Sequence, residues 1–200
     1  MSQQFEVNST KLKTKYGDFD FYCFTWGIHE EDNILCQVKQ EYSESPLVRI
    51  QSACYTAEIF RSLDCDCHEQ LEESLKRIQK EGGIIIYMLC DGRGAGLQNK
   101  VKGLELGRLH NLDTSDAYKT LGIEQDPREY NRTAQILQYF HINSIRLLTN
   151  NPRKIEGLKK YGIKTIRETL EIPATLDSAP YLQTKTFKMG HMMKQFDSHD

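Results

Sequence analysis

The period of the apolar residues changes at about Cys67, and this change limits the fold more than any other feature of the chain. Before it, short alternating or aromatic-rich runs are separated by polar turns, a pattern typical of β-strands. These runs cover residues 13–25, 34–40 and 46–53, with turns at 29–33 and 42–45. After it, Leu71, Leu75 and Ile78 follow at helical spacing, and Gly82-Gly83 ends the predicted helix.

The rest of the chain predicts strands that alternate with helices. Apolar runs at 84–89, 144–149 and 163–167 are predicted strands. Predicted helices cover 97–110, 113–122, 127–140, 151–161 and a basic, Met-rich stretch at 181–196. The chain is therefore predicted to be an α+β protein with mixed sheets, antiparallel strands first and strand–helix alternation in the second half. We expect one domain over residues 1–200, with a tail from about residue 174 that is a candidate for flexibility.

Composition excludes several classes of function. The formal net charge of -2 and a pI near 6.3 give no basic field for nucleic acid. The mean hydropathy is -0.59, and no apolar run approaches the roughly 20 residues that cross a bilayer. The first ten residues, MSQQFEVNST, lack the pattern of a secretory signal. We expect a cytoplasmic protein, in which clustered cysteines are ligands more often than disulfides.

Three cysteines, Cys54, Cys65 and Cys67, lie within fourteen residues. Three thiolates form a soft site suited to zinc, which is usually tetrahedral. A catalytic zinc leaves its fourth position for water, whereas a structural zinc takes a fourth protein ligand, for which His68 is the nearest candidate. Ordinary buried cysteines are the alternative.

Two strand-to-helix junctions are candidate anion sites. The loop from Asp91 to Gly96 offers backbone N–H groups and Arg93, although a plain turn explains it equally well. At the second junction, Thr149 ends a predicted strand and Lys154 falls in the first helical turn. The segment Asp126-Pro127-Arg128 precedes another predicted helix, where a capping carboxylate is the ordinary interpretation.

Taken together, these segments resemble the GTP cyclohydrolase II family from about Lys11 to the Met-Gly-His of residues 189–191. The motifs that carry the resemblance are R-x-x-S-x-C ending at Cys54, S-L-x-C-D-C ending at Cys67 with Gln70-Leu71, G-R-G-x-G-L-x-N-K, Leu121-Gly122 with D-x-R, and R-L-L-T-N-N-P-x-K. Their order and spacing are specific, whereas no single motif is.

The resemblance implies an enzyme that hydrolyses GTP, opens the imidazole ring, and releases formate, pyrophosphate and a diaminopyrimidine ribotide, the first step towards riboflavin. It implies one Zn2+ per chain on Cys54, Cys65 and Cys67, Mg2+ with the triphosphate, and a homodimer. Asp126 is implied as the proton acceptor and Arg128 as the group that attacks the α-phosphate, although a guanidinium stays protonated and stabilisation of charge is an equal alternative. The implied nucleotide contacts are Arg49, Ser52, Gln70, Asp91, Gly92, Arg93, Thr114, Thr149 and Lys154.

The departures from the family pattern concentrate around the metal. They are Gln51 for a histidine, Ala53 for a glutamate, Asp64 for an arginine, His68 for a small residue, Asp91 for a glutamate and Leu104 for a tyrosine associated with completing ring opening. They motivate an alternative, a specialised paralogue that stops at the formamidopyrimidine or acts on another nucleotide. A second alternative is a non-catalytic, zinc-containing nucleotide-binding module, in which His68 closes the metal site.

Overall fold

The computed structural model describes residues 5–196, and its strands form one mixed sheet in the order β1-β2-β3-β5-β4-β6-β7. The pairs β1–β2, β2–β3 and β3–β5 are antiparallel, whereas β5–β4, β4–β6 and β6–β7 are parallel. The strands are β1 (Glu6–Thr14), β2 (Gly17–Thr25), β3 (Asn33–Lys39), β4 (Leu47–Ser52), β5 (Gly83–Met88), β6 (Ser144–Leu148) and β7 (Lys164–Glu168). The α+β architecture with antiparallel N-terminal strands is confirmed.

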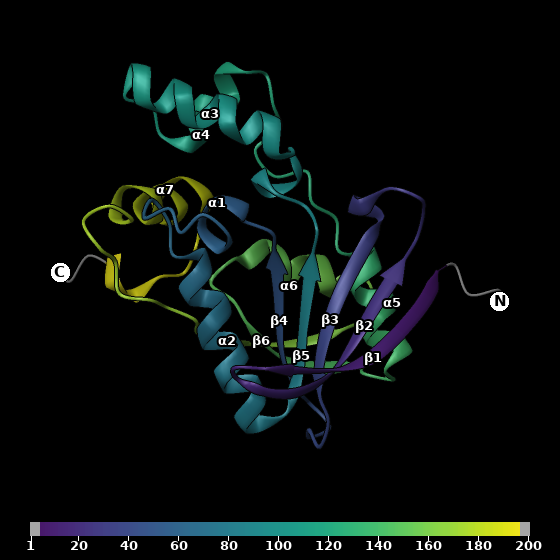
Figure 1. Cartoon of the computed structure of the whole chain (residues 1–200). Helices are drawn as coiled ribbons and strands as arrows, with labels where there is room; N and C mark the ends of the chain where they lie inside the picture. The colour runs from purple at the N-terminus through teal and green to yellow at the C-terminus, as the bar shows by residue number, and fades with distance from the viewer. Residues whose placement is uncertain (1–4, 197–200) are drawn as a thin grey trace.

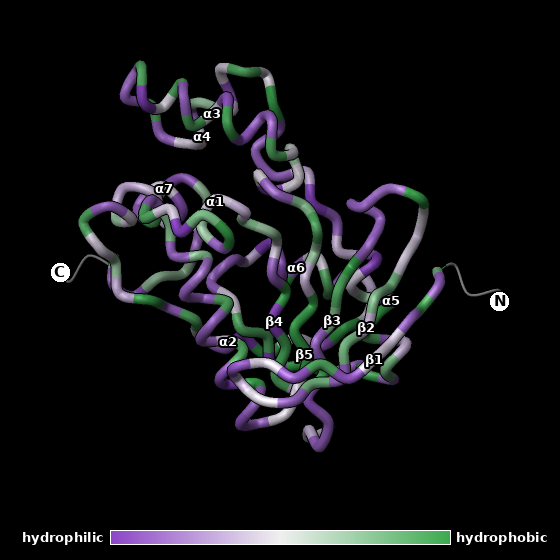
Figure 2. Tube along the Cα trace, in the orientation of Figure 1, coloured by the Kyte–Doolittle hydropathy of each residue, from purple (hydrophilic) through white to green (hydrophobic). Residues whose placement is uncertain are grey.

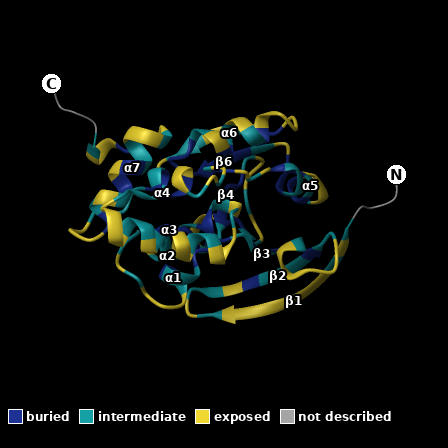
Figure 3. Ribbon diagram, turned by 90° about the horizontal axis from the view of Figure 1, so that it is seen from above, coloured by how far each residue is buried: buried dark blue, intermediate teal, exposed yellow. Residues whose placement is uncertain are grey.

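The helices that interrupt these strands flank the sheet on two sides (Figures 1 and 3). They are α1 (Tyr55–Glu58), α2 (Cys67–Glu81), α3 (Leu97–His110), α4 (Thr114–Thr120), α5 (Asn131–Tyr139), α6 (Pro152–Lys159) and α7 (Ala179–Met189), with short 3-10 turns η1 (Glu30–Asp32), η2 (Gly92–Gly94) and η3 (Lys194–Phe196). Helix α2 lies on one side, and α5 and α6 lie on the other. The α3–α4 pair rises above the ends of β4 and β5.

Three sequence predictions of element bounds were wrong. The helix predicted at 181–196 ends at Met189, because Gly190 adopts a left-handed conformation with φ +68° that closes it. The run at 13–25 is not one strand, because it contains the turn of the β1–β2 hairpin, in which Thr14 pairs with Gly17. The mostly polar β1 has no alternating pattern to reveal it, since it is an edge strand with little buried surface. The helix predicted from Pro127 begins only at Asn131. Arg128 lies before the helix, and its guanidinium is hydrogen-bonded to Asp126.

Alternation along the strands divides the core into two clusters. Val48, Ile50, Ile84 and Ile86 face α5 and α6, whereas Ile85 faces α2. Figure 2 shows hydrophobic residues gathered along the central strands. Central parallel strands are covered on both faces, so these residues form continuous apolar runs. The sheet is therefore a rigid platform for whatever its strand ends carry.

The strand ends that matter for function belong to β5, β4 and β6, which run parallel to one another. The chain leaves β4 towards α2 on one face, but leaves β6 towards α6 on the other. Connections that diverge in this way open a crevice at the carboxyl edge of the sheet. A binding site is therefore expected at this edge of the sheet.

We expect Gly83→Ala to destabilise the fold strongly. Gly83 has φ +144°, and a Cβ there would lie 2.0 Å from the backbone oxygen of Leu47 in the paired strand β4. The backbone cannot yield without breaking the β4–β5 pairing, so the free energy of unfolding should fall by about 3 kcal/mol or more in urea denaturation. Gly162→Ala is the control, since Gly162 has φ +79° but open space, and should cost only about 1–2 kcal/mol. Equal losses would contradict the steric argument.

Candidate active site

A cavity opens at the carboxyl ends of β4, β5 and β6, with about 1070 Å3 of empty space counted to its mouth. Every site residue predicted from the sequence except Asp126 lines it. These are Arg49, Ser52, Cys54, Cys65, Cys67, Gln70, Asp91, Gly92, Arg93, Thr114, Arg128, Thr149 and Lys154. Asp126 lies directly behind Arg128, to which it is hydrogen-bonded. The fold thus brings together residues that are separated by up to about a hundred positions in the sequence.

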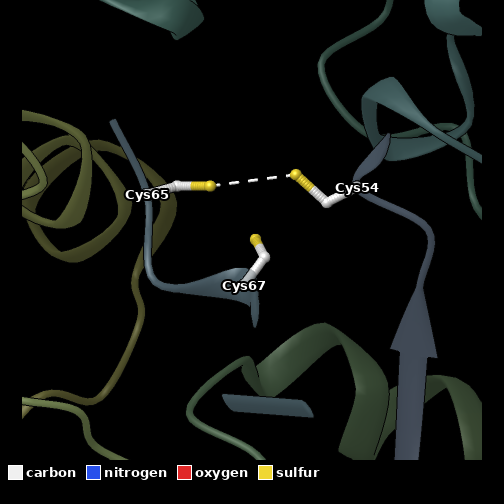
Figure 4. A group of neighbouring side chains, drawn as sticks. All are labelled: Cys54, Cys65 and Cys67. Carbon is white, nitrogen blue, oxygen red and sulfur yellow. Dashed lines mark hydrogen bonds between the residues drawn. The ribbon is translucent and has the colours of Figure 1, made fainter. Parts of the chain in front are cut away.

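The three predicted cysteines converge on one point of this cavity. Cys54 follows β4, and Cys65 and Cys67 lie at the start of α2, with the three sulfurs pointing towards one another (Figure 4). The three Sγ atoms lie within 4.8 Å of one another, and those of Cys54 and Cys65 are 3.8 Å apart. A tetrahedral zinc with Zn–S bonds of about 2.3 Å separates its sulfurs by about 3.8 Å, so the cluster fits zinc.

The protonation of the cluster also favours a cation. Hydrogen bonds from Cys65 and Cys67 lower the pKa of Cys54, and the ammonium of Lys100, 3.2 Å from its Sγ, adds to the effect. The same contact with Cys54 raises the pKa of Cys65 to about 12, and that of Cys67 also rises well above its usual range. Three thiols in contact cannot all ionise without a nearby positive charge, because neighbouring thiolates repel one another. A bound metal ion would supply that charge.

His68 does not join the cluster. Its Nδ1 contacts the guanidinium of Arg61, and its Nε2 lies 3.6 Å from a carboxylate oxygen of Glu72. Among the residues that the structure describes, the group able to hold a metal consists of the three cysteines alone. His68 therefore does not supply the fourth protein ligand that a closed structural metal site would need.

Arg49 is buried at the end of β4 and points into the cavity wall. Its guanidinium donates to Gln51 Oε1 at 2.8 and 2.9 Å, to Gln70 Oε1 at 2.7 Å and to the Leu148 carbonyl at 3.0 Å. All of these acceptors are neutral, and burial lowers the pKa of Arg49 to about 10. Gln51, one of the departures from the family pattern, therefore orients this cation, and its amide also donates to Glu58.

Lys154 is the second buried cation, and it reaches the cavity from the first turn of α6. Asn151 caps that helix by accepting from the backbone N–H of Arg153, with Pro152 at its first position. The ammonium of Lys154 donates to the Ile50 carbonyl at 2.7 Å and forms no ion pair with a described carboxylate. Burial, together with Arg49, lowers the pKa of Lys154 well below its usual range. Such a group gains from an anionic ligand.

Asp126 and Arg128 form a bidentate ion pair, with both N···O distances 2.7 Å. Arg128 also donates to Ser52 Oγ at 2.9 Å. Burial alone would lower the pKa of Arg128, but the hydrogen bond to Asp126 raises it. Burial would raise the pKa of Asp126, but Arg128 lowers it instead. Both groups are held in their charged forms, which favours charge stabilisation over nucleophilic attack by Arg128.

The glycine-rich turn after β5 is built around Asp91. Its carboxylate accepts from Lys100 Nζ and from the Tyr55 backbone N–H, both at 2.8 Å. Arg93 follows with φ 60°, an uncommon conformation for a residue with a side chain, and its guanidinium lies 4.8 Å from the centroid of the Tyr118 ring. The turn thus presents Arg93 to the cavity, where the nearby Thr114 Oγ1 is buried without a hydrogen-bond partner.

The remaining departures and several residues missed in the sequence also line the cavity. Ala53, Asp64 and Leu104 lie in its walls. The missed residues are Lys100, Tyr118, Tyr181, Lys185, Met189 and His191. Lys100, Met189 and His191 fall within the motifs that carry the family resemblance, and this position was the signal from which the sequence could have identified them. Met189 therefore belongs to the cavity wall, whereas the buried Met193 is packed in the fold.

The fold and this cavity define a class of α+β protein in which a cluster of three thiols and several buried basic side chains share one site. A comparison with protein families agrees: residues 4–170 match the model described as GTP cyclohydrolase II. The chain belongs to the GTP cyclohydrolase II family.

Relatives among well-characterised proteins carry the description "Riboflavin biosynthesis protein RibBA". The protein from Staphylococcus epidermidis is 45% identical over 184 residues, which cover 92% of this chain and 46% of that protein. The protein from Staphylococcus aureus is 44% identical over 185 residues, with the same coverage. The chain therefore spans about half the length of the curated relatives that it matches.

A search of solved structures found the crystal structure of RibBX, a two-domain 3,4-dihydroxy-2-butanone 4-phosphate synthase from A. baumannii. It is 19% identical, with a TM-score of 0.48, over 86% of this chain and 41% of that one. Within residues 5–196, no helix combines the length and apolar character needed to span a membrane.

Substitution of the clustered cysteines should remove zinc. Cys54→Ser, Cys65→Ser and Cys67→Ser each delete one of three thiolate ligands, so each should lower zinc affinity by more than about a hundredfold, beyond the loss typical of outer-shell changes. Metal analysis after dialysis against a chelator measures this. Cys23→Ser is the control, because Cys23 lies on β2 outside the cluster. Zinc retention by all three variants would contradict the assignment.

Lys154→Met should stabilise the empty protein while weakening stabilisation by phosphate ligands. The substitution removes a buried charge that lacks a carboxylate partner, and the gain should be about 1–3 kcal/mol less the lost hydrogen bond to Ile50. Thermal unfolding with and without triphosphate measures both effects. Lys159→Met, on the exposed side of the same helix, should change neither. If Lys154→Met unfolds at a lower temperature than the wild type without ligand, and triphosphate still stabilises it as it stabilises the wild type, this role of Lys154 is refuted.

Proposed function

We propose that the protein is a zinc-dependent hydrolase that opens the imidazole ring of GTP, releasing formate and pyrophosphate and leaving a diaminopyrimidine ribotide. The observation that carries the proposal is a cavity in which the trithiol cluster of Cys54, Cys65 and Cys67 adjoins Arg49 and Lys154, two buried basic side chains that form no ion pair with a carboxylate of residues 5–196. Membership of the GTP cyclohydrolase II family and the RibBA relatives support a place in riboflavin biosynthesis.

The roles of the residues follow from their charges and partners. Cys54, Cys65 and Cys67 would hold the zinc ion, which when bound would supply Lewis acidity for the activation of water at neutral pH. Arg49 and Lys154 bind the phosphates. The negative charge of the phosphates balances the positive charge of these two side chains. Asp126 fixes the guanidinium of Arg128, which stabilises charge as pyrophosphate leaves. Magnesium accompanies the triphosphate.

Asp126 is also the proposed proton acceptor, and its geometry defines the condition for that role. Both carboxylate oxygens are engaged by Arg128 and the pKa is lowered, so Asp126 is ionised at neutral pH but is a weak base. Contact between Arg128 and a phosphate would weaken the pair and raise the basicity of the carboxylate. Substrate binding would thereby prepare the base for its role.

A second candidate function is the truncated reaction that stops at the formamidopyrimidine. The observation that favours it is Leu104, which lines the cavity and carries no hydroxyl. A non-catalytic module is less well supported, because its closed metal site requires His68, which contacts Arg61 and Glu72 instead. The homodimer and the cytoplasmic location expected from the sequence remain predictions.

Mass spectrometry of the zinc-loaded protein incubated with GTP and magnesium tests the proposal. We expect the diaminopyrimidine ribotide, with formate and pyrophosphate each released in amounts equal to the GTP consumed. Accumulation of the formamide would establish the truncated reaction, and Leu104→Tyr should then restore formate release. The matched control is Leu109→Tyr, at an exposed position of the same helix outside the cavity. Unchanged GTP would refute both candidate functions.

A further inference from the structure

Helix α7 forms one wall of the cavity although it lies beyond residues 4–170 that match the family model. Figure 1 shows it below the α3–α4 pair, and Lys188 of α7 pairs with Asp116 of α4. It contributes Tyr181, Lys185 and Met189 to the lining, and His191 follows directly. The basic tail that the sequence left without a function therefore belongs to the site.

Contacts from three directions hold α7 in this position. Lys188 forms ion pairs with Asp113 and Asp116 at the start of α4, the latter at 2.7 Å. Arg93 donates to the Met189 sulfur at 2.9 Å, and the Met192 backbone N–H donates to the Asn150 carbonyl at 2.9 Å. The side chains on the inner face of α7 are consequently fixed towards the cavity.

Lys185 is the cation on that face, and its ammonium has unused hydrogen-bonding capacity. Its side chain is 12% exposed, and the nearest carboxylate oxygen, Asp66 Oδ1, is 3.5 Å from Nζ. The Tyr181 ring centroid is 4.2 Å away. Among residues 5–196, the buried Asp66 Oδ1 accepts no hydrogen bond, so its contact with Lys185 Nζ is a long ion pair without one. An ammonium has three donors, and Lys185 can therefore donate to a further acceptor that enters the cavity.

The charge of Lys185 acts on the same cavity as the other cations. Lys185 is one of the groups that lower the pKa of Lys154, and it contributes, after burial, to lowering the pKa of His191 to about 2. His191 is therefore neutral, and Lys154 and Lys185 repel one another across a confined space. A polyanion between them would relieve this repulsion, and its oxygens would accept hydrogen bonds from the ammonium of Lys185.

We propose that Lys185 is a substrate-binding residue whose ammonium donates to phosphate oxygens of the nucleotide, in the cavity that Arg49 and Lys154 also line. This inference rests on the proposed function, since it names a further contact to the triphosphate of that substrate. Asp66 orients Lys185 without saturating it, and Lys188 fixes the helix that carries it.

Calorimetric titration of the zinc-loaded full chain with inorganic triphosphate, in the presence of magnesium, tests the assignment without turnover. Loss of a charge-assisted hydrogen bond should weaken triphosphate binding to Lys185→Met by about tenfold or more, whereas Lys185→Arg should stay within about threefold of the wild type. Lys194→Met is the matched control, because Lys194 is exposed on η3 outside the cavity and should bind as the wild type does. Affinity for guanosine, which has no phosphate, should be unchanged in all variants.

Wild-type affinity of Lys185→Met for triphosphate would overturn the proposal. Equal losses for triphosphate and guanosine, or loss of zinc from Lys185→Met, would also overturn it, because each assigns Lys185 a structural role. Failure of the proposed function has a different signature. If the wild-type protein leaves GTP unchanged but its triphosphate binding depends on Lys185, the proposed reaction is wrong and the Lys185 contact stands. If the wild-type protein hydrolyses GTP but Lys185→Met binds triphosphate normally, the reaction stands and the contact is wrong.

Discussion

Arg49 and Lys154 carry positive charge into the interior at the edge of the sheet, and neither forms an ion pair with a described carboxylate. Burying a cation without a counter-charge costs free energy. Binding of an anionic ligand in the cavity would offset this cost. The two side chains are surrounded by neutral acceptors, Gln51, Gln70 and backbone carbonyls, which fix their positions without neutralising them. The cavity is thus preorganised for an anion.

The trithiol cluster has the opposite electrostatic requirement. Three sulfurs in contact need a cation to ionise fully, and Lys100 and Lys185 supply only part of that charge from outside the cluster. Asp91 holds Lys100 beside Cys54. A metal on the sulfurs and a polyanion on the basic residues would therefore balance each other within one cavity. This arrangement suits a substrate whose reacting ring and phosphate chain must be held at the same time.

The departures from the family pattern have different structural consequences. Gln51 is integrated, since its amide links Arg49 to Glu58. His68 is directed away from the metal cluster by Arg61 and Glu72. Ala53 and Leu104 instead leave the cavity wall without the polar groups that the family pattern would place there. The departures thus fall in and beside the cavity wall, whereas Cys54, Cys65 and Cys67 are all present and line the cavity.

The sequence by itself determined the α+β class and most element bounds, because apolar periodicity and helix caps are local properties, and the motifs that carry the family resemblance pointed to the residues that meet in the cavity. Asp113 and Asn151 cap their helices as their positions in the chain predict. Local pattern failed for β1, an edge strand with little buried surface, and for the start of α5, where Arg128 turns to Asp126 instead of continuing a helix. Only the tertiary structure decided which charges lack partners, that His68 is excluded from the cluster, and that Lys185 reaches the site from a distant helix. These depend on long-range packing, because the distance between two charges is set by how the sheet and helices assemble and not by their separation along the chain.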